Sequence, residues 1–502
     1  MKLLLFNYGL CLCVATGMFA PALSAATSSS SQATAKTAHA LSNFEPCRIQ
    51  VNATEIDAEC AVLTRPENPT KPKGKTVDLF VAKLPSLSSS PAADAFTIIQ
   101  GGPGGSSIDL AVNYTAFLDI IRAKRDVIIV DQRGTGRSNK LSCDIDSDDS
   151  FASTFDPALT AKLTRECVAK LQNHDLSAYT TSVAVQDLEA LREAAGYPQL
   201  SIYGVSYGTR VAQHYLRRFP RHTRTIIIDG VVDIGLNLAG AEIALRSQDA
   251  FNQMVVRCNK TPSCVDEFGD IAEQFAIVRQ RLKSDNINAS VPHPNTGEEQ
   301  QISLNESHLL IAVRLMPYST ESLSLLPLLI NSAYHGNYAP LATQSLLNTE
   351  SIADGFAIGM HNSVMCTEDA PFVDSNAAQK ASNTYFGSLM VDNMSITCQH
   401  WPQGIIDDDF LEPFDADVPV LILSGETDPV TPPANGERAA KMFSNSKHLI
   451  IPSHGHGVIA RGCMPFLVKD FLNEANLDNI NADCIQREKA MPFFVNTTGP
   501  KP

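Results

Sequence analysis

Short runs of apolar residues recur along the chain and are rich in isoleucine, valine and leucine. The clearest runs lie at 76–84, 95–100, 126–131, 200–204, 225–230, 420–423 and 447–451. Most are apolar throughout rather than alternating, which is typical of strands buried on both faces of a sheet. Between them, 182–196 and 207–219 carry apolar residues at helical spacing. This alternation predicts an α/β fold with a mostly parallel sheet.

The alternation stops between residues 236 and 409, where the pattern is mostly helical. The clearest helical segments there are Leu304–Met316 and Leu323–Ala333. We therefore expect a core in two parts, 46–235 and 410–502, separated by a large and mainly helical cap at 236–409. A chain of 502 residues is long enough for such an arrangement.

The N-terminal pattern differs from the rest. Met1 and Lys2 precede an apolar run that reaches about Leu23, which is typical of a secretory signal peptide over 1–25. Residues 26–45 are rich in Ser, Thr and Ala and predict a flexible leader. No later apolar run has membrane-spanning length. We expect an exported protein, periplasmic or extracellular, without a membrane anchor.

Charge narrows the range of partners. The formal net charge is −15 and the pI is about 5.2, which argues against nucleic acid as a partner. The sequence gives no indication of the oligomeric state.

Cysteine usage agrees with export. Ten of the twelve cysteines follow the predicted signal peptide, an even number that suggests disulfides in an exported chain. They form five couples of sequence neighbours, and we expect pairing in that order: Cys47–Cys60, Cys143–Cys167, Cys258–Cys264, Cys366–Cys398 and Cys463–Cys484. Their spacings do not match a zinc site, so no metal is predicted.

The strand at 200–204 leads into Gly204-Val205-Ser206-Tyr207-Gly208, a G-x-S-x-G sequence. Such a sequence places a serine on a sharp turn between a strand and a helix, where glycines on either side prevent steric clashes. We therefore predict that Ser206 is a nucleophile.

The strand at 95–100 runs into a second glycine-rich loop, Gly101-Gly102-Pro103-Gly104-Gly105-Ser106. A phosphate-binding Walker loop needs a following Gly-Lys-Ser/Thr, which is absent, and no nucleotide cofactor is predicted. With Ser206 as nucleophile, the loop is better explained as part of an oxyanion hole. The backbone N–H groups of Gly102 and Tyr207 are the predicted donors.

An activated serine needs a base, and the base needs a carboxylate that orients it. Asp428 follows the strand at 420–423, and His456 follows the strand at 447–451, in a loop between two glycines. We predict Asp428 as the acid and His456 as the base, with Glu426 and His454 as the competitors.

Four segments together resemble the proline iminopeptidase and tripeptidyl aminopeptidase family of serine peptidases. They are the glycine loop at 101–106, Asp131-Gln132-Arg133-Gly134-Thr135-Gly136-Arg137-Ser138, the serine turn at 204–208, and Gly425-Glu426-Thr427-Asp428-Pro429-Val430-Thr431-Pro432-Pro433. The resemblance implies an α/β-hydrolase core with a helical cap, no cofactor, and cleavage of peptides near their free N-terminus. It also implies that Ser206, Asp428 and His456 form the catalytic triad.

The sequence departs from the family in one respect. Proline iminopeptidases carry a tryptophan-rich cap motif ending in a glutamate that binds the amino group of the substrate. This chain has a single tryptophan, Trp401. Because they lie beside the predicted cap, Glu368 and Asp369 are the candidates to replace that glutamate in binding the amino group. A carboxylesterase using the same triad remains the alternative.

Overall fold

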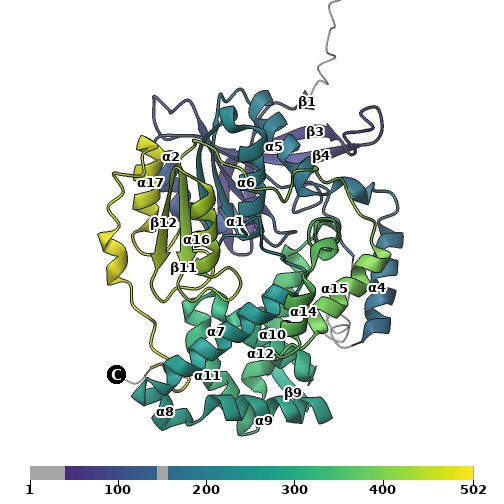
Figure 1. Ribbon diagram of the computed structural model, residues 1–502, viewed down its shortest axis with the longest axis vertical. Coiled ribbons are helices and arrows are strands. Elements are labelled where there is room, and N and C mark those ends of the chain that lie inside the picture. Colours follow the sequence, from purple (N-terminus) through teal and green to yellow (C-terminus); the bar gives the residue numbers. More distant parts are fainter. Residues whose placement is uncertain (1–39, 144–155, 286, 501–502) are drawn as a thin grey trace, which may run out of the picture. The chain divides into compact units, whose positions relative to one another are not determined.

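The computed structural model describes residues 40–143, 156–285 and 287–500 (Figure 1). Residue contacts divide the chain into Met1–Ala38 and His39–Pro502, and only the second unit contains described residues. The predicted signal peptide and most of the predicted leader therefore lie outside them. Within the described part, no helix has both the length and the apolar character needed to cross a membrane.

The second unit is built on a ten-stranded sheet with the order β1-β3-β4-β6-β5-β7-β8-β11-β12, in which β2 pairs with β3. Six neighbouring strands are parallel: β6 (Val127–Val130), β5 (Ala95–Ile99), β7 (Leu200–Val205), β8 (Thr223–Asp229), β11 (Val420–Gly425) and β12 (Ser446–Ile451). Apart from β12 and the half-buried Arg224 of β8, these strands are buried along their whole length. The continuous apolar runs of the sequence are thus explained by helices on both faces.

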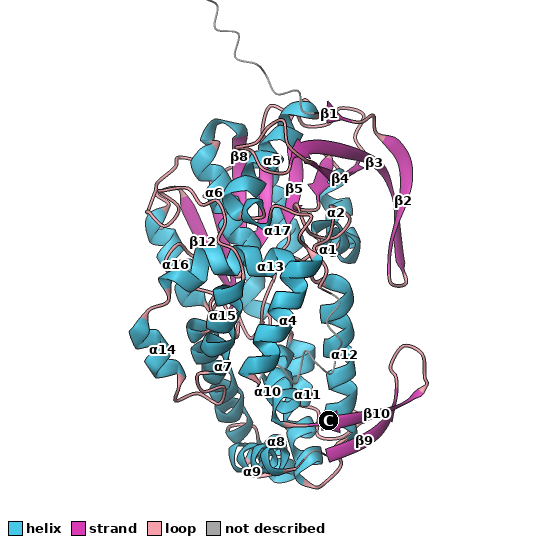
Figure 2. Ribbon diagram, turned by 90° about the vertical axis from the view of Figure 1, so that its right-hand side faces the viewer, coloured by secondary structure: helices cyan, strands magenta, loops and turns pink. Residues whose placement is uncertain are grey.

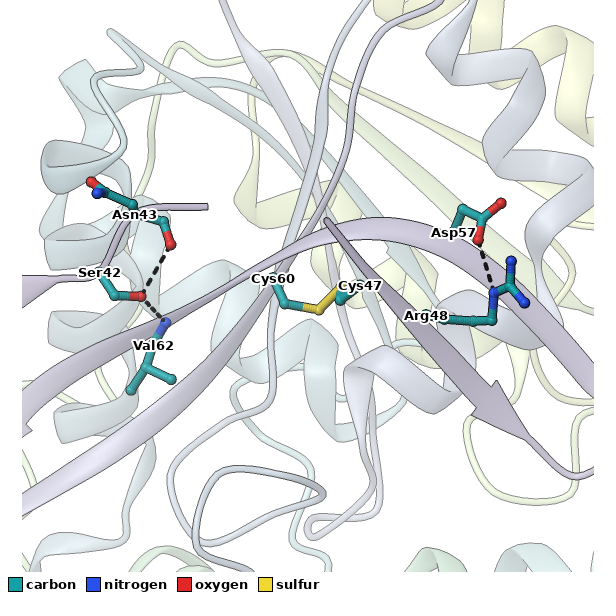
Figure 3. The surroundings of a disulfide bond; sticks show 7 residues. All are labelled: Ser42, Asn43, Cys47, Arg48, Asp57, Cys60 and Val62. Atoms are coloured by element: carbon teal, nitrogen blue, oxygen red, sulfur yellow. Dashed lines mark hydrogen bonds and ion pairs between the residues drawn. A yellow bond between two sulfur atoms is a disulfide. The ribbon is translucent and has the colours of Figure 1, made fainter. Parts of the chain in front are cut away.

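The other edge of the sheet is antiparallel. It consists of β1 (Ala40–Leu41), β2 (Glu45–Val51), β3 (Thr54–Pro66) and β4 (Thr76–Leu84). The strands β2 and β3 form a hairpin that carries the disulfide between Cys47 and Cys60 (Figure 3). On either side of it, Arg48 Nε donates to Asp57 Oδ1 at 3.1 Å and Ser42 Oγ accepts from Val62 N at 2.9 Å.

Helices cover both faces of the sheet. One apolar cluster joins one face to α5 (Thr181–Ala194), α6 (Tyr207–Arg218) and α16 (Pro433–Met442). A second cluster joins the opposite face to α1 (Ser107–Asn113), α2 (Thr115–Arg122) and α17 (Met464–Glu474). This is the doubly covered sheet that the alternation of strands and helices predicts.

Most of the segment between β8 and β11 shares an apolar cluster of its own and lies in the lower half of Figure 1, whereas Met360 and Val364 join the apolar cluster of the core. We call this segment the insertion. Its elements are α7 (Ala241–Asn259), α8 (Pro262–Phe268), α9 (Ile271–Ser284), β9 (Ile287–Pro292), β10 (Glu299–Leu304), α10 (Glu306–Leu315), η3 (Met316–Tyr318), α11 (Thr320–Tyr334), α12 (Ala339–Gly355), α13 (Ile358–Val364), the π-helical η4 (Met365–Asp369), η5 (Ala370–Phe372), α14 (Ser375–Ala381) and α15 (Leu389–His400). The hairpin of β9 and β10 (Figure 2) was not expected from the sequence.

Further segments connect these parts. The core also contains α4 (Pro157–Lys170), which packs against α15, and the short helices η1 (Leu176–Ala178), η2 (Pro220–His222) and η6 (Asp483–Arg487). After η6 the chain returns to the insertion, where Phe493 and Val495 join its apolar cluster. The backbone N–H of Phe494 donates to the Ser324 carbonyl at 3.0 Å.

The described residues contain five disulfides, and these join the five couples of cysteines that are neighbours in sequence. Each bond ties one element to the next stretch of chain. Cys366–Cys398, for example, connects η4 to α15 across 32 residues.

Candidate active site

Ser206 occupies the turn between β7 and α6 with φ +57°, a conformation that non-glycine residues rarely adopt. A Cβ atom on Gly204 would collide with the Gly208 carbonyl oxygen, and one on Gly208 would collide with the Ile99 carbonyl oxygen. Glycine is therefore required at both positions. The backbone N–H of Ser206 donates to the Asp229 carbonyl at 2.9 Å, which holds the turn against the end of β8.

The glycine loop after β5 lies directly against this turn. A Cβ atom on Gly101 would come within 2.5 Å of Ser206 Cβ, so only glycine allows the approach. Two backbone N–H groups are available to bind an anion here. Among the described residues, neither Gly102 N nor Tyr207 N donates to another group of the chain. Free N–H groups beside a serine hydroxyl are what an oxyanion hole requires.

The insertion covers the glycine loop. Ala357 N donates to the Gly104 carbonyl at 3.0 Å, and His361 Nδ1 lies 3.1 Å from the Pro103 carbonyl oxygen. A Cβ atom on Gly102 would lie 2.8 Å from the Phe356 ring. Residues of the loop before α13 and of α13 itself therefore form one wall of the site.

His456 and Asp428 are in direct contact. Nδ1 of His456 lies 2.7 Å from Oδ2 of Asp428, and both side chains are buried. Asp428 Oδ1 also accepts from the backbone N–H groups of Val430 and Thr431, at 2.9 and 2.8 Å. The Thr431 hydroxyl donates to Asp428 Oδ2 at 2.9 Å and lies 3.1 Å from His456 Nδ1. The carboxylate is thus fixed by three donors besides the imidazole.

Electrostatics favour an ion pair once His456 takes up a proton. Burial opposes the charged imidazolium, but the Asp428 carboxylate outweighs it, and the pKa of His456 is raised above 6.5. Burial also opposes the Asp428 carboxylate, yet His456 and the backbone donors lower its pKa below 3.8. The pair therefore suits a histidine that accepts a proton during a reaction.

Ser206 and His456 lie at the same edge of the sheet. Gly230, which follows β8, would place a Cβ atom 2.9 Å from His456 Cε1, and Ser206 follows the neighbouring strand β7. The residue after His456, Gly457, similarly faces the Val205 side chain. Among the described residues no hydrogen bond joins the Ser206 hydroxyl to His456, as is common in sites without substrate.

Two family models match the chain. Residues 94–267 match the model described as alpha/beta hydrolase fold, and residues 383–484 match the model described as TAP-like protein. These matches show that the chain has the α/β-hydrolase fold. The predicted fold is thereby confirmed.

Relatives of the hydrolase carry names of peptidases and of an esterase. Serine protease Hip1 of Mycobacterium tuberculosis H37Rv is 24% identical over 490 residues, covering 88% of this chain and 90% of its own. Tripeptidyl aminopeptidase of Streptomyces lividans is 30% identical over 218 residues, 40% of each chain. Carboxylesterase B of M. tuberculosis CDC 1551 is 28% identical over 225 residues, 41% of this chain and 43% of its own. The predicted resemblance to tripeptidyl aminopeptidases is confirmed, and the hydrolase is a serine hydrolase related to peptidases.

The competitors for acid and base in the hydrolase lie differently. His454 Nδ1 lies 2.9 Å from the Pro452 carbonyl oxygen, and its Nε2 faces Glu488 at 3.9 Å. Glu426 is exposed and accepts from the backbone N–H of Ser453. Neither is in contact with the pair formed by Asp428 and His456, so the contacts favour that pair.

Glu368 and Asp369 lie in η4 and are almost completely buried. Glu368 accepts from the backbone N–H and the hydroxyl of Thr181, at 2.7 and 2.8 Å, at the N-terminus of α5. Burial raises its pKa to about 7 although Arg210 opposes the rise. Asp369 accepts from Arg210 Nη1 and Nη2 at 2.7 and 2.9 Å and from Leu238 N at 2.7 Å. Both carboxylates thus have partners within the hydrolase, and their role toward a substrate remains a prediction.

The sequence did not single out Asp229, which ends β8. Its Oδ2 accepts from Val458 N at 2.7 Å, from Ile459 N at 2.9 Å and from the Tyr203 hydroxyl at 3.1 Å. It thereby fixes the loop that carries His456. Burial raises its pKa to about 6. A charged residue ending an apolar strand was the available signal.

Tyr318 was also missed. Its carbonyl accepts from His456 N at 2.9 Å, and its ring meets the imidazole edge-on at 5.1 Å between centroids. Nothing in the local sequence pattern points to this contact, because Tyr318 belongs to the insertion. No group of three or more metal-ligating side chains gathers anywhere in the described ranges.

Proposed function

We propose that the chain is an exported serine exopeptidase that hydrolyses peptide bonds near the free N-terminus of peptides. The observation that carries the proposal is the contact between His456 and Asp428 beside the turn of Ser206. The relatives named as a serine protease and as tripeptidyl aminopeptidases support peptides as the substrate class. The predicted signal peptide and the five disulfides support export.

In the proposed mechanism, Ser206 Oγ attacks the carbonyl carbon of the scissile bond while His456 Nε2 accepts the hydroxyl proton. Asp428 keeps Nδ1 protonated and stabilises the imidazolium. The N–H groups of Gly102 and Tyr207 stabilise the oxyanion. His456 then gives its proton to the leaving amine, and water attacks the acyl-enzyme with His456 again as base.

Substitutions test the triad. We expect Ser206→Ala and His456→Ala each to lower kcat by about 10⁴-fold or more without changing the melting temperature greatly. His454→Ala is the matched control and should have a mild effect. A dead His454→Ala beside an active His456→Ala would show that the base is assigned wrongly.

Carboxylesterase activity is the second candidate, favoured by the relative named Carboxylesterase B. An aminopeptidase must bind a free ammonium group, whereas an esterase need not. A panel of aminoacyl, prolyl and tripeptidyl anilides, each free and N-acetylated, together with short acyl esters, separates the two. Equal turnover of free and acetylated peptides would exclude the aminopeptidase.

The amino-group role of Glu368 and Asp369 is a separate proposal. If Glu368 binds the ammonium group, Glu368→Gln should lower the kcat/KM for free peptides, with a loss of transition-state stabilisation of about 2–5 kcal/mol. The kcat/KM for acetylated peptides should stay nearly unchanged. If it only caps α5 at Thr181, the substitution should lower stability and affect both substrates alike. The ratio of the two activities therefore decides between the roles.

A further inference from the structure

An arginine of the insertion, Arg314 of α10, is separated from His456 by the Tyr318 side chain and has no acidic partner among the described residues. Its Nη2 is 3.4 Å from the Tyr318 hydroxyl and its guanidinium carbon is 5.9 Å from the Tyr318 ring centroid. The same ring meets His456 edge-on at 5.1 Å. Arg314 is partly buried, and no aspartate or glutamate among the described residues forms an ion pair with it. The charge of Arg314 disfavours protonation of His456. An unpaired arginine at this position therefore needs a functional explanation.

Two buried hydroxyl groups lie near Arg314. Ser247 of α7 is 1% exposed, and Tyr385, between α14 and α15, is 3% exposed. Within the described ranges, neither hydroxyl has a hydrogen-bond partner outside this pair, and Arg314 Nε has none. Burial raises the pKa of the Tyr385 phenol, while the nearby charge of Arg314 and the Ser247 hydroxyl oppose the rise. We call Ser247, Arg314, Tyr318 and Tyr385 the Arg314 cluster.

The chemistry of the cluster points to an anion. Buried polar groups without partners are costly, so a cluster of them indicates a ligand that satisfies them. The cluster offers guanidinium and hydroxyl donors and one positive charge, which a carboxylate matches with two charged acceptor oxygens. The ammonium group of a peptide would be repelled there.

The position of the Arg314 cluster relative to His456 indicates which part of a substrate it would meet. The base gives its proton to the leaving amine, and Arg314 reaches His456 across Tyr318. The part of the substrate nearest to this side of His456 is the leaving segment. We propose that Arg314, with Ser247 and Tyr385, binds a carboxylate of the leaving segment, so that the enzyme prefers short peptides that carry a negative charge beyond the scissile bond.

This inference rests on the proposed peptidase function, and the carboxylate has two possible sources. It is either the C-terminal carboxylate of a short peptide or an acidic side chain of the leaving segment. Three peptides with the same free N-terminal half distinguish them: one with a neutral leaving segment and a C-terminal acid, its C-terminal amide, and the amide with Asp in place of Asn. The kcat/KM of each is measured for the full-length enzyme.

We expect the wild-type enzyme to prefer the acid or the Asp peptide over the neutral amide by about 10- to 100-fold. In Arg314→Gln the ratio of charged to neutral substrate should fall to within about threefold of one. Arg281→Gln is the matched control: Arg281 is another insertion arginine over a tyrosine ring, Tyr334, but it is exposed. That variant should keep the wild-type ratio.

Each outcome is informative. A preference for the acid alone identifies the C-terminal carboxylate, and a preference for Asp alone identifies a side chain. Cleavage of all three peptides at equal rates, or an unchanged ratio in Arg314→Gln, overturns the inference while the peptidase function stands. Failure to cleave any of the peptides, with esters hydrolysed, overturns both. Because only ratios within one variant are compared, partial loss of folded Arg314→Gln does not affect the result.

Discussion

At the residue scale, Thr431 shows how a single hydroxyl can support the proposed triad. It donates to Asp428 Oδ2 and lies within 3.1 Å of His456 Nδ1. Its backbone N–H also holds Oδ1, so the threonine fixes both oxygens of the carboxylate. The sequence prediction included the acid and the base but not this third residue.

Thr431→Val keeps the shape of the side chain and removes the hydroxyl. We expect kcat to fall about 10- to 100-fold with little change in KM, because the carboxylate loses a charged hydrogen bond that orients it. Thr431→Ser retains the hydroxyl and should restore most of the activity. Steady-state kinetics on one anilide substrate measure both, and equal activity of the Val and Ser variants would contradict the positioning role.

If His456 is the base, as proposed, its pKa sets the acid limb of the pH profile of activity. The base acts in its neutral form, and its pKa is raised because Asp428 outweighs the effect of burial. The activity should therefore fall as the pH drops through a midpoint above 6.5. In Asp428→Asn the main cause of the raised pKa is lost while burial remains, so the midpoint should move to lower pH.

The pH dependence of kcat/KM from pH 4.5 to 9 measures this shift. The Asn variant should also lose about 10⁴-fold in kcat. A midpoint that stays in place in Asp428→Asn would mean that another group controls the limb, and Asp229, whose charge also acts on His456, is the first candidate.

At the scale of elements, the disulfides differ in the length of chain that they close. Cys366–Cys398 closes 32 residues and joins η4, which carries Glu368, to α15, whereas Cys258–Cys264 closes only 6. In the chain-entropy model the longer loop contributes about 4 kcal/mol and the shorter about 2 kcal/mol.

Replacing both members of each pair by alanine tests this difference. We expect the Cys366/Cys398 variant to lose about 4 kcal/mol of unfolding free energy and the Cys258/Cys264 variant about half as much. Denaturant unfolding of the oxidised proteins provides the values. A larger loss for the shorter loop would show that local packing, not loop length, dominates.

At the scale of the whole molecule, the sequence predicted the core better than the insertion. Buried parallel strands form continuous apolar runs, so the sequence pattern alone was enough to locate β5, β6, β7, β8 and β11. The turn of Ser206 and the loop of His456 follow such strands and were predicted with them. The hairpin of β9 and β10 was not, because its strands alternate exposed and half-buried residues and carry no apolar run.

Contacts between distant segments were the main omission. Tyr318 and Arg314 approach His456 only because the insertion folds back over the core, and no local pattern reports such an approach. The predicted amino-group role of Glu368 and Asp369 rested only on their position near the cap boundary. Their contacts with Thr181 and Arg210 depend on tertiary structure and could not be predicted from the sequence.

The segment after η6 provides the prediction that belongs to the whole molecule. Phe493 is 1% exposed in the apolar cluster of the insertion, and the guanidinium carbon of Arg257 lies 4.1 Å from its ring centroid. Phe493→Ala should destabilise the protein by about 3–5 kcal/mol. Hydrogen exchange should rise most in α7 and α11, which contact this segment; a uniform rise over the core would contradict the local role.

The same segment has a consequence for how substrates enter. The chain crosses between core and insertion before α7 and after α15, and it crosses a third time beyond η6. With connections only to the neighbouring strands β8 and β11, the insertion could pivot about them. The third connection, beyond η6, restrains that movement. If the chain is the proposed exopeptidase, this restraint should favour substrates with a free chain end over folded polypeptides.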